Sequence, residues 1–553
     1  MKDRVTAAVF VVTHASVDEY RATRMSDDIG VEGQKSLPQR GIGVARHEPL
    51  AFRCDEFRHR VWQELRERHR DRLDLEYGVD ARSTDRKWSH AARITDSAGV
   101  RLADRSLDLY DGSSQRRYGT GAGVHATIEQ KLGPVLLAPG YTRWNARTYL
   151  FSAFITIGML AFIAFIQPYL LNANLKVPAD QQGRVLGLLG VSNEIISLLL
   201  VAPFGALSDK VGRRPVYALG FLWLAAGFFL YPLATTIPQL LGCALFFSVG
   251  VAAVGCMLAT VLADIPAERS RGLFVGITGF CQGLGATLAV LVLGRVPQKL
   301  AAGGLDPMTA GRITLGVAAG LCILTAILCW LGLKRGRPGG DAERMPLRQV
   351  LATGLAAART NPRIWFAYML QFVSFADRII IGTYFSARLQ QTAIAHGQTV
   401  AQATAAATKP YVIANSAGLL CAIFFGIALD RMNRVTAGAV AMFVAGVGYI
   451  AGGFVGDPTS EWITLVAVLL GMGQICAILA SQTVLGQEAP AEVRGAVFGL
   501  AGIFASLGIL FTSSVGGWLY DVVDQGAPFF LIGGVNMIVM LFGLYLLRAR
   551  PTL

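Results

Sequence analysis

Charged residues are scarce in this sequence. Only 16% of its 553 residues are Asp, Glu, Lys or Arg, whereas a soluble protein of this length carries roughly a quarter. Hydrophobic residues make up 53% of the chain. From Arg147 onward they gather in runs of about 20 to 25 residues, each long enough to cross a hydrocarbon core of about 30 Å as a helix. We therefore expect an integral membrane protein.

The signatures of the common enzyme classes are also missing. The sequence holds no P-loop, no HExxH, no GxSxG and no carboxylates paired at a useful spacing. We expect neither an enzyme nor an ATP-driven pump, and no cofactor. The eight cysteines show no CxxC spacing, and all but Cys54 fall within apolar runs, so we interpret them as small hydrophobic residues and expect no metal site.

The apolar runs predict an all-α membrane fold of twelve transmembrane helices. We expect a six-helix bundle over 147–333, a loop over 334–362 and a second six-helix bundle over 363–553. Within the loop, Pro346–Arg359 could form a helix on the membrane surface. The stretch 387–409 is expected either to extend helix 7 or to form a short outer helix. The expected spans are 148–172, 183–207, 214–234, 239–263, 272–295, 311–333, 363–388, 409–429, 435–455, 462–486, 495–519 and 527–548.

The net charge of +13 indicates topology rather than a nucleic-acid partner. Lys and Arg are more frequent in alternate loops, on the side that also holds the 334–362 loop, and cytoplasmic loops carry such an excess. Both termini are therefore expected in the cytoplasm, with the protein in the plasma (inner) membrane. We expect the protein to be embedded in the lipid bilayer as a monomer, and we expect no nucleic-acid partner.

Residues 1–146 differ from the rest of the chain. They hold six of the seven histidines and mixed charge clusters such as Arg66–Arg72, and their apolar periodicity is weak. We expect a polar, disordered N-terminal extension, or upstream sequence included through a start-site error. A regulatory or nucleic-acid-binding arm is the alternative. The histidine spacings do not indicate a metal site.

Two motifs occur once in each predicted half. The segment Gly205–Arg214 has a shorter counterpart at Gly426–Arg434, and Asp264–Gly276 has a counterpart at Glu488–Gly499. Asp430 follows Asp209 by 221 residues, and Gly495 follows Gly272 by 223. Two motifs repeated at nearly one offset indicate an internal duplication of six helices.

The Gly205–Arg214 segment resembles the signature loop between helices 2 and 3 of the major facilitator superfamily. The resemblance covers about residues 147–550. It implies two pseudo-symmetric bundles around a central cavity that work by alternating access. It also implies a charge network in which Asp209 and Arg213 join Asp264 and latch the inner side shut; a purely structural role for this loop is the alternative. The residues assigned to this signature and gating set are Gly205, Asp209, Gly212, Arg213, Arg214, Asp264, Asp430, Arg434 and Glu488.

The acids of this set share a physical problem. Asp209, Asp264, Asp430 and Glu488 lie at the predicted C-terminal ends of helices 2, 4, 8 and 10, where a carboxylate opposes the helix macrodipole. Four arginines that lie within reach in the sequence are expected to compensate them: Arg213, Arg271, Arg434 and Arg494. The family's drug/proton antiporters carry an arginine in helix 4 and a Gly-Pro pair in helix 5; this sequence has neither, which argues against that subgroup.

Three ionisable residues fall near the middle of predicted spans: Glu194, Asp377 and Arg378. A charge at that depth costs at least about 2.5 kcal/mol, so it usually faces a cavity and has a function. We predict Asp377 as the titrating or substrate-binding acid and Glu194 as the second, with a buried structural pair as the alternative. Further candidates for substrate or proton binding are Asn193, Gln282, Gln371, Asn415 and Gln474.

The function predicted from these features is secondary active transport. We expect a small-molecule substrate moved by alternating access and coupled to a proton or another ion. A non-transporting receptor or sensor on the same fold is the alternative. The substrate and the direction of transport stay open.

Overall fold

The computed structural model describes residues 130–336 and 346–549, and it contains twelve helical segments long and apolar enough to cross a membrane. This confirms the predicted fold class. Residues 1–129 of the extension that is expected to be disordered lie outside the described residues, and so do residues 337–345 of the expected loop 334–362. The twelve segments are Arg143–Ala173, Ala179–Val211, Arg213–Leu233, Ile237–Asp264, Glu268–Ala302, Pro307–Gly332, Pro362–Ala395, Val400–Leu429, Arg434–Phe454, Ile463–Glu488, Arg494–Val522 and Ala527–Ala549.

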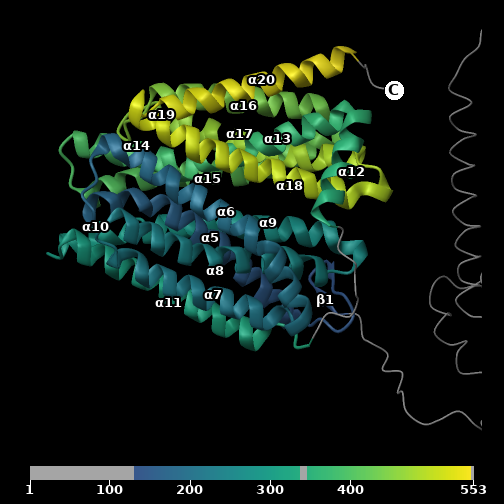
Figure 1. The fold of residues 1–553 in the computed structure, drawn as a ribbon, viewed down its shortest axis with the longest axis horizontal. Helices are drawn as coiled ribbons and strands as arrows, with labels where there is room; N and C mark the ends of the chain where they lie inside the picture. Colours follow the sequence, from purple (N-terminus) through teal and green to yellow (C-terminus); the bar gives the residue numbers. More distant parts are fainter. Residues whose placement is uncertain (1–129, 337–345, 550–553) are drawn as a thin grey trace, which may run out of the picture. The chain divides into compact units, whose positions relative to one another are not determined.

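The helices form two bundles, one from each half of the described chain (Figure 1). The first comprises α5 (Arg143–Ala173), α6 (Gln182–Val211), α7 (Arg213–Leu230), α8 (Ile237–Asp264), α9 (Arg271–Leu293), α10 (Val296–Ala302) and α11 (Pro307–Gly332). The second comprises α13 (Pro362–Ile379), α14 (Ser386–Ala395), α15 (Val400–Arg431), α16 (Arg434–Phe454), α17 (Ile463–Glu488), α18 (Arg494–Phe511), α19 (Gly517–Val522) and α20 (Ala527–Ala549). Between them, α12 (Leu347–Thr360) packs against α13 and α18, close to the predicted surface helix.

Glycines let the same helices approach closely in both bundles. A Cβ at Gly285 of α9 would collide with the backbone of Phe154 in α5, and a Cβ at Gly508 of α18 would collide with the backbone of Phe372 in α13. Gly508 follows Gly285 by 223 residues, the same offset as in the second repeated motif. Small residues commonly provide such close helix contacts in membranes. The duplication in the sequence is therefore also a duplication in packing.

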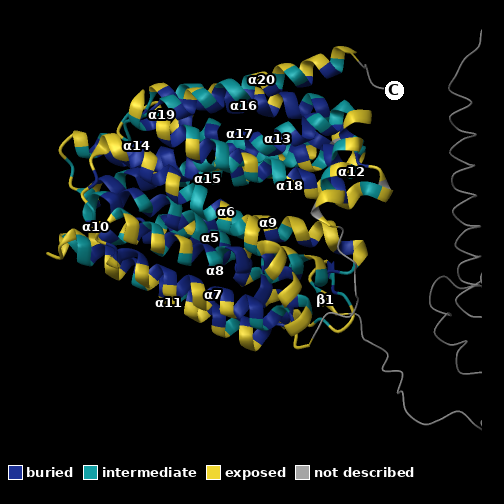
Figure 2. Cartoon of the chain, in the orientation of Figure 1, coloured by how far each residue is buried: buried dark blue, intermediate teal, exposed yellow. Residues whose placement is uncertain are grey.

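Buried residues line the contacts within each bundle, and exposed residues cover the outward faces (Figure 2). In the first bundle α5 packs on α9 and α11, while α8 packs on α6 and α7. In the second, α13 packs on α17 and α18, while α16 packs on α17 and α20. The exposed faces include large apolar side chains such as Phe454 and Leu331, as expected for helices whose solvent is lipid.

Two spans contain a short π-helical segment. The span that begins with α13 passes through Ile380–Phe385 (η4) before α14, and the span that begins with α18 passes through Thr512–Gly516 (η6) before α19. π-helical turns are rare and often occur at functional sites. Here they interrupt the first and fifth spans of the second bundle.

The last part of the predicted N-terminal extension is folded. Strands β1 (Lys131–Leu132) and β2 (Val135–Leu136) form a hairpin that lies against the connection between α8 and α9. Ala138 donates its N–H to the Ile265 carbonyl at 2.8 Å. Ser270 accepts the Leu136 N–H at 2.9 Å and donates its hydroxyl to the Leu136 carbonyl at 2.8 Å. The boundary expected at residue 146 is therefore too late, because weak periodicity did not reveal this hairpin.

Substituting Ser270 by alanine is expected to destabilise the protein. The change leaves the Leu136 N–H without its partner, a loss worth about 1–3 kcal/mol for a buried donor. The melting temperature of the purified full-length protein should fall. Ser460→Ala is the control, since Ser460 accepts only a long 3.3 Å bond from the exposed Trp462 N–H. Equal melting temperatures for Ser270→Ala and the wild type would show that the hairpin does not hold this connection.

Candidate functional site

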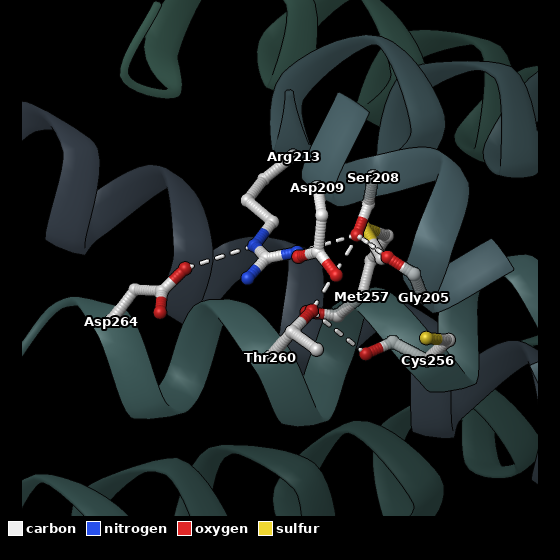
Figure 3. Close-up of polar contacts among 8 residues, drawn as sticks. All are labelled: Gly205, Ser208, Asp209, Arg213, Cys256, Met257, Thr260 and Asp264. Atoms are coloured by element: carbon white, nitrogen blue, oxygen red, sulfur yellow. Dashed lines mark hydrogen bonds and ion pairs between the residues drawn. The ribbon is translucent and has the colours of Figure 1, made fainter. Parts of the chain in front are cut away.

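The signature loop is a single-residue turn between α6 and α7. Gly212 links the two helices with φ of 100°, a conformation that favours glycine. The turn places Arg213, the first residue of α7, beside the end of α6. Its Nη1 donates to the Asp209 Oδ1 at 2.5 Å and to the Ser208 Oγ at 2.5 Å, and its Nε donates to the Asp264 Oδ2 at 3.0 Å (Figure 3).

Arg213 thus bridges the C-terminal ends of two helices. Asp264 is the last residue of α8, and Asp209 lies in the last turn of α6. Each carboxylate faces the negative end of its own helix, so an unpaired acid there would be unfavourable. The Arg213 side chain is only 17% exposed, and its guanidinium compensates both acids at once. The structure brings together the three residues that the sequence grouped, and it adds Ser208.

The corresponding acid of the second bundle uses a different partner from the one expected. Glu488 at the end of α17 accepts from Arg363 Nη1 at 3.0 Å and from Asn361 Nδ2 at 2.8 Å. Arg434 instead donates to Gln487 at 2.6 Å, and Arg494 donates to the Gly486 carbonyl at 3.5 Å. Arg363 was visible in the sequence as a basic residue at the start of a span, but no periodicity links it to Glu488.

Other members of the signature set have more local roles. Arg214 is buried and stacks over the Trp330 ring at 4.6 Å, so it attaches α7 to α11. Gly205 accepts a hydrogen bond from the Ser208 hydroxyl at 2.8 Å. The side chain of Asp430 lies outside the described residues.

Tyr141 lies next to the signature loop, just before α5. Burial raises the pKa of Tyr141 to about 12, and the nearby Asp264 carboxylate adds to this effect. The Lys334 Nζ lies over its ring at 4.4 Å. Tyr141 therefore stays neutral over the physiological pH range and extends the polar cluster around Asp264.

Glu194 of the first bundle and Arg378 of the second each lie near the middle of a span, and each faces the other bundle. Glu194 lies near the middle of α6, and Arg378 lies near the middle of the span Pro362–Ala395. The two charges are within electrostatic range of each other. Ser506 of α18 lies close to Glu194, and Tyr411 of α15 lies close to Arg378. Four helices from both bundles therefore meet in one polar layer.

Asp377 points away from this layer. Its side chain is 0% exposed, and its Oδ1 accepts from Asn536 Nδ2 of α20 at 3.1 Å. The Tyr449 hydroxyl of α16 donates to the Asp377 backbone carbonyl at 3.3 Å. Asp377 therefore lies inside the second bundle, while its neighbour Arg378, about 100° further round the helix, faces the first bundle.

The candidate amides are spread over several environments. Gln371 is buried and accepts from the Ser481 hydroxyl at 2.9 Å, which links α13 to α17. Asn415 donates to the Tyr411 carbonyl at 3.0 Å and lies near the polar layer. The other three are half-buried: Asn193, Gln282 and Gln474.

The two bundles are held together at the end opposite the signature loop. Asp521, at the C-terminal end of α19, accepts the N–H groups of Gly183 and Arg184 at 2.7 Å each, one with each carboxylate oxygen. These are N–H groups of the first turn of α6, where a carboxylate complements the helix dipole. The Asp521 side chain is only 1% exposed. This residue was missed because it falls just beyond the predicted span.

Glutamines extend this contact between the bundles. Gln391 donates to Gln182 at 2.8 Å and accepts from the Tyr520 hydroxyl at 2.8 Å. Gln390 donates to the Phe165 carbonyl of α5 at 3.2 Å. At the signature-loop end, in contrast, the ion pairs of Arg213 and Arg363 each stay within one bundle. The hydrogen bonds between bundles within residues 130–336 and 346–549 thus lie at the opposite end.

Sequence and structure comparisons agree with this architecture. The model of the Major Facilitator Superfamily matches residues 148–509 and 367–553. The chain therefore belongs to this superfamily of membrane transporters. It is 28% identical to the magnetosome protein MamZ of Magnetospirillum gryphiswaldense over 75% of this chain, and it spans only 63% of the length of MamZ. It is 27% identical to the magnetosome protein MamH of Paramagnetospirillum magneticum, covering 73% of this chain and 93% of MamH.

Solved transporters share the fold at low sequence identity. The nucleoside transporter NupG is 16% identical, with a TM-score of 0.55 over 73% of this chain and 99% of NupG. A POT family transporter in complex with 5-aminolevulinic acid is 13% identical, with a TM-score of 0.56 over 74% of this chain and 96% of its own. These likenesses concern the fold and assign no substrate to this chain.

Proposed function

We propose that this protein is a secondary active transporter that moves a small solute by alternating access and couples this movement to protons. The observation that carries the proposal is the asymmetry between its two ends. Asp521 and the glutamines join the bundles at one end, whereas the ion pairs at the signature-loop end stay within each bundle. A transporter opened on one side has this arrangement.

The orientation follows from the distribution of basic residues. The excess of Lys and Arg in the loops on the signature-loop side supports an orientation in which that side, and both termini, face the cytoplasm. With this proposed orientation the structure would be an inward-facing state, and the plasma membrane is the proposed location. MamZ and MamH are named as magnetosome proteins, so membrane fractionation should compare the plasma membrane with any internal membrane.

The signature loop has a mechanical role in this proposal. Arg213 holds the ends of α6 and α8 as one unit, so that the two helices move together when the signature-loop end closes. Closing would bring this unit towards Glu488 and Arg363 of the second bundle. The network then acts as the latch of the outward-facing state.

Glu194 is the proposed coupling group. It lies in the polar layer between the bundles, where opening to one side and then the other changes its access to water. A carboxyl in that place can take a proton on one side and release it on the other. Asp377 is the second candidate, since it is also buried at mid-depth but is enclosed within one bundle.

The test uses the full-length protein in proteoliposomes that contain a pH-sensitive dye. Phosphate, citrate, glutamate, choline and glucose are supplied outside, and internal pH and labelled solute are followed together. Wild-type protein should accumulate one of these solutes and move protons with it. Glu194→Gln should lose proton movement and gradient-driven accumulation but keep exchange of labelled solute at equal pH.

The control variant is Asp377→Asn, which should retain gradient-driven accumulation. Loss of coupling in Asp377→Asn alone would move the coupling role to Asp377. Full accumulation in both variants would show that neither acid couples protons. Saturable binding of a solute without any accumulation would favour a receptor.

A further inference from the structure

Arg378 is a charged side chain at mid-membrane depth that has no direct partner in the described chain. At 1.5 Å per residue, about 25 Å of helix lies on either side of it. Within residues 130–336 and 346–549, Arg378 makes no hydrogen bond or ion pair; the Glu194 carboxyl and the neutral Tyr411 hydroxyl lie close enough to interact with it electrostatically. Its five N–H donors therefore have no acceptor among the described residues.

The Arg378 side chain is exposed, although helices surround it. Exposure at this depth means that a water-sized molecule can reach the guanidinium between the bundles. An arginine held at the middle of a membrane is costly, and such residues normally face a pathway for a substrate or an ion. Lipid contact does not explain the exposure, because Arg378 faces Glu194 of the other bundle.

The Arg378 guanidinium itself favours a negatively charged ligand. Glu194 is buried with Ser506 close to its carboxyl, so it is less accessible than Arg378. Asn415, one helical turn from Tyr411, is half-buried and adds an amide to the same layer. A guanidinium is a planar fork whose geometry matches a carboxylate or a phosphate through two parallel hydrogen bonds.

We infer that the solute carried by this protein bears an oxyanion, a carboxylate or a phosphate, and that Arg378 binds this group in the layer between the bundles. The inference rests on the proposed transport function. Arg378 belongs to the second bundle and Glu194 to the first, so an anion held at Arg378 lies where both bundles can contact it. Arg378 is then a specificity-determining residue that rejects cationic and neutral solutes.

The position of Arg378 also connects binding to the backbone. It lies two residues before the π-helical segment η4, whose residues Ile380–Phe385 are buried. Since π-helical turns often occur at functional sites, an anion that fixes Arg378 also fixes the start of this segment.

The experiment measures thermal stabilisation of the purified full-length protein in detergent. Sodium phosphate, sodium citrate and sodium glutamate are compared with choline chloride and glucose at constant ionic strength. At least one oxyanion should raise the melting temperature saturably in the wild type, and choline and glucose should not. Which oxyanion acts distinguishes a phosphate from a carboxylate.

The variants then assign the effect to Arg378. In Arg378→Gln the concentration for half-saturation should rise about 10- to 100-fold, as expected for loss of a charge-assisted bidentate contact. Arg378→Lys should lie between, because it keeps the charge and loses the fork. Arg312→Gln, at an exposed arginine near the start of α11, should behave as the wild type. Arg378→Lys also keeps the test valid if Arg378→Gln does not fold.

Three results would overturn the anion assignment: stabilisation by choline or glucose alone, no stabilisation by any of the oxyanions, or an unchanged half-saturation in both Arg378 variants. Failure of the transport proposal looks different. An oxyanion that binds through Arg378 but never accumulates in proteoliposomes would refute transport and keep the site. Accumulation of choline or glucose would keep transport and refute the site.

Discussion

Replacing Asp521 by asparagine is expected to open the end of the molecule that is closed in this structure. The carboxylate accepts two N–H groups from the first turn of α6, one with each oxygen. A carboxamide can accept only one of them, and its NH₂ group would then face the other N–H. Hydrogen bonds to a charged group contribute about 1.5–3 kcal/mol, so the balance between closed and open states should shift by roughly one to two orders of magnitude.

Spin labels on Thr235 and Ala395 can measure this shift, because both residues are exposed at this end and belong to different bundles. Native cysteines that react are first replaced. The wild type should give one short inter-label distance, and Asp521→Asn should add a longer one. Asp524→Asn is the matched control: Asp524 accepts only the Gly526 N–H of its own bundle, at 2.7 Å. Unchanged distances in Asp521→Asn would indicate that packing at Gly183 and Gly187, and not the carboxylate, closes this end.

Replacing Arg213 by alanine is expected to lower stability more than the loss of any exposed arginine. The change leaves Asp264, which is 24% exposed, without its partner at the C-terminal end of α8. Removing one member of a partly buried pair costs on the order of 1–3 kcal/mol after allowance for solvent screening. Asp209 adds less, because its side chain is 41% exposed.

Arg271→Ala provides the comparison. Arg271 pairs with Glu268 at 2.9 Å in the same region, but the two side chains are 48% and 80% exposed, so its loss should cost less than about 1 kcal/mol. Melting temperatures of full-length variants in detergent separate the two cases. Arg213→Lys should recover part of the loss, since one ammonium cannot bridge both acids. Equal shifts for Arg213→Ala and Arg271→Ala would show that the bridge adds nothing to stability.

The sequence predicted the number and approximate position of the spans because length and hydropathy determine whether a helix can cross a membrane. The resemblance of Gly205–Arg214 to the family's signature loop also grouped Asp209, Arg213 and Asp264. The direction in which a side chain points from its helix was harder to predict. Asp377 and Arg378 are adjacent in sequence, and only packing against α20 shows that the acid faces inward to its own bundle while the arginine faces the other.

Contacts between distant helices could not be predicted at all. No pattern in the sequence indicates that Asp521 caps α6 of the other bundle, because Asp521 and Gly183 are more than 300 positions apart. The same holds for Glu488 and Arg363, where proximity and charge sign suggested Arg494 instead. The orientation in the membrane and the latch remain predictions.

The π-helical segments η4 and η6 have a mechanical consequence. A π turn is a common point at which a helix bends, and these two lie on the side of the second bundle that meets α5 and α6. Each span therefore has a joint at its π-helical turn. Helix α14 can tilt while α13 stays packed on α17, and α19 can tilt while α18 stays packed on α12. Tyr384 of η4 donates to the Ser513 carbonyl of η6 at 3.0 Å, so the two joints are tied and would flex as a pair. Bending at these joints would move the short helices α14 and α19, which contact α5 and α6 at the closed end.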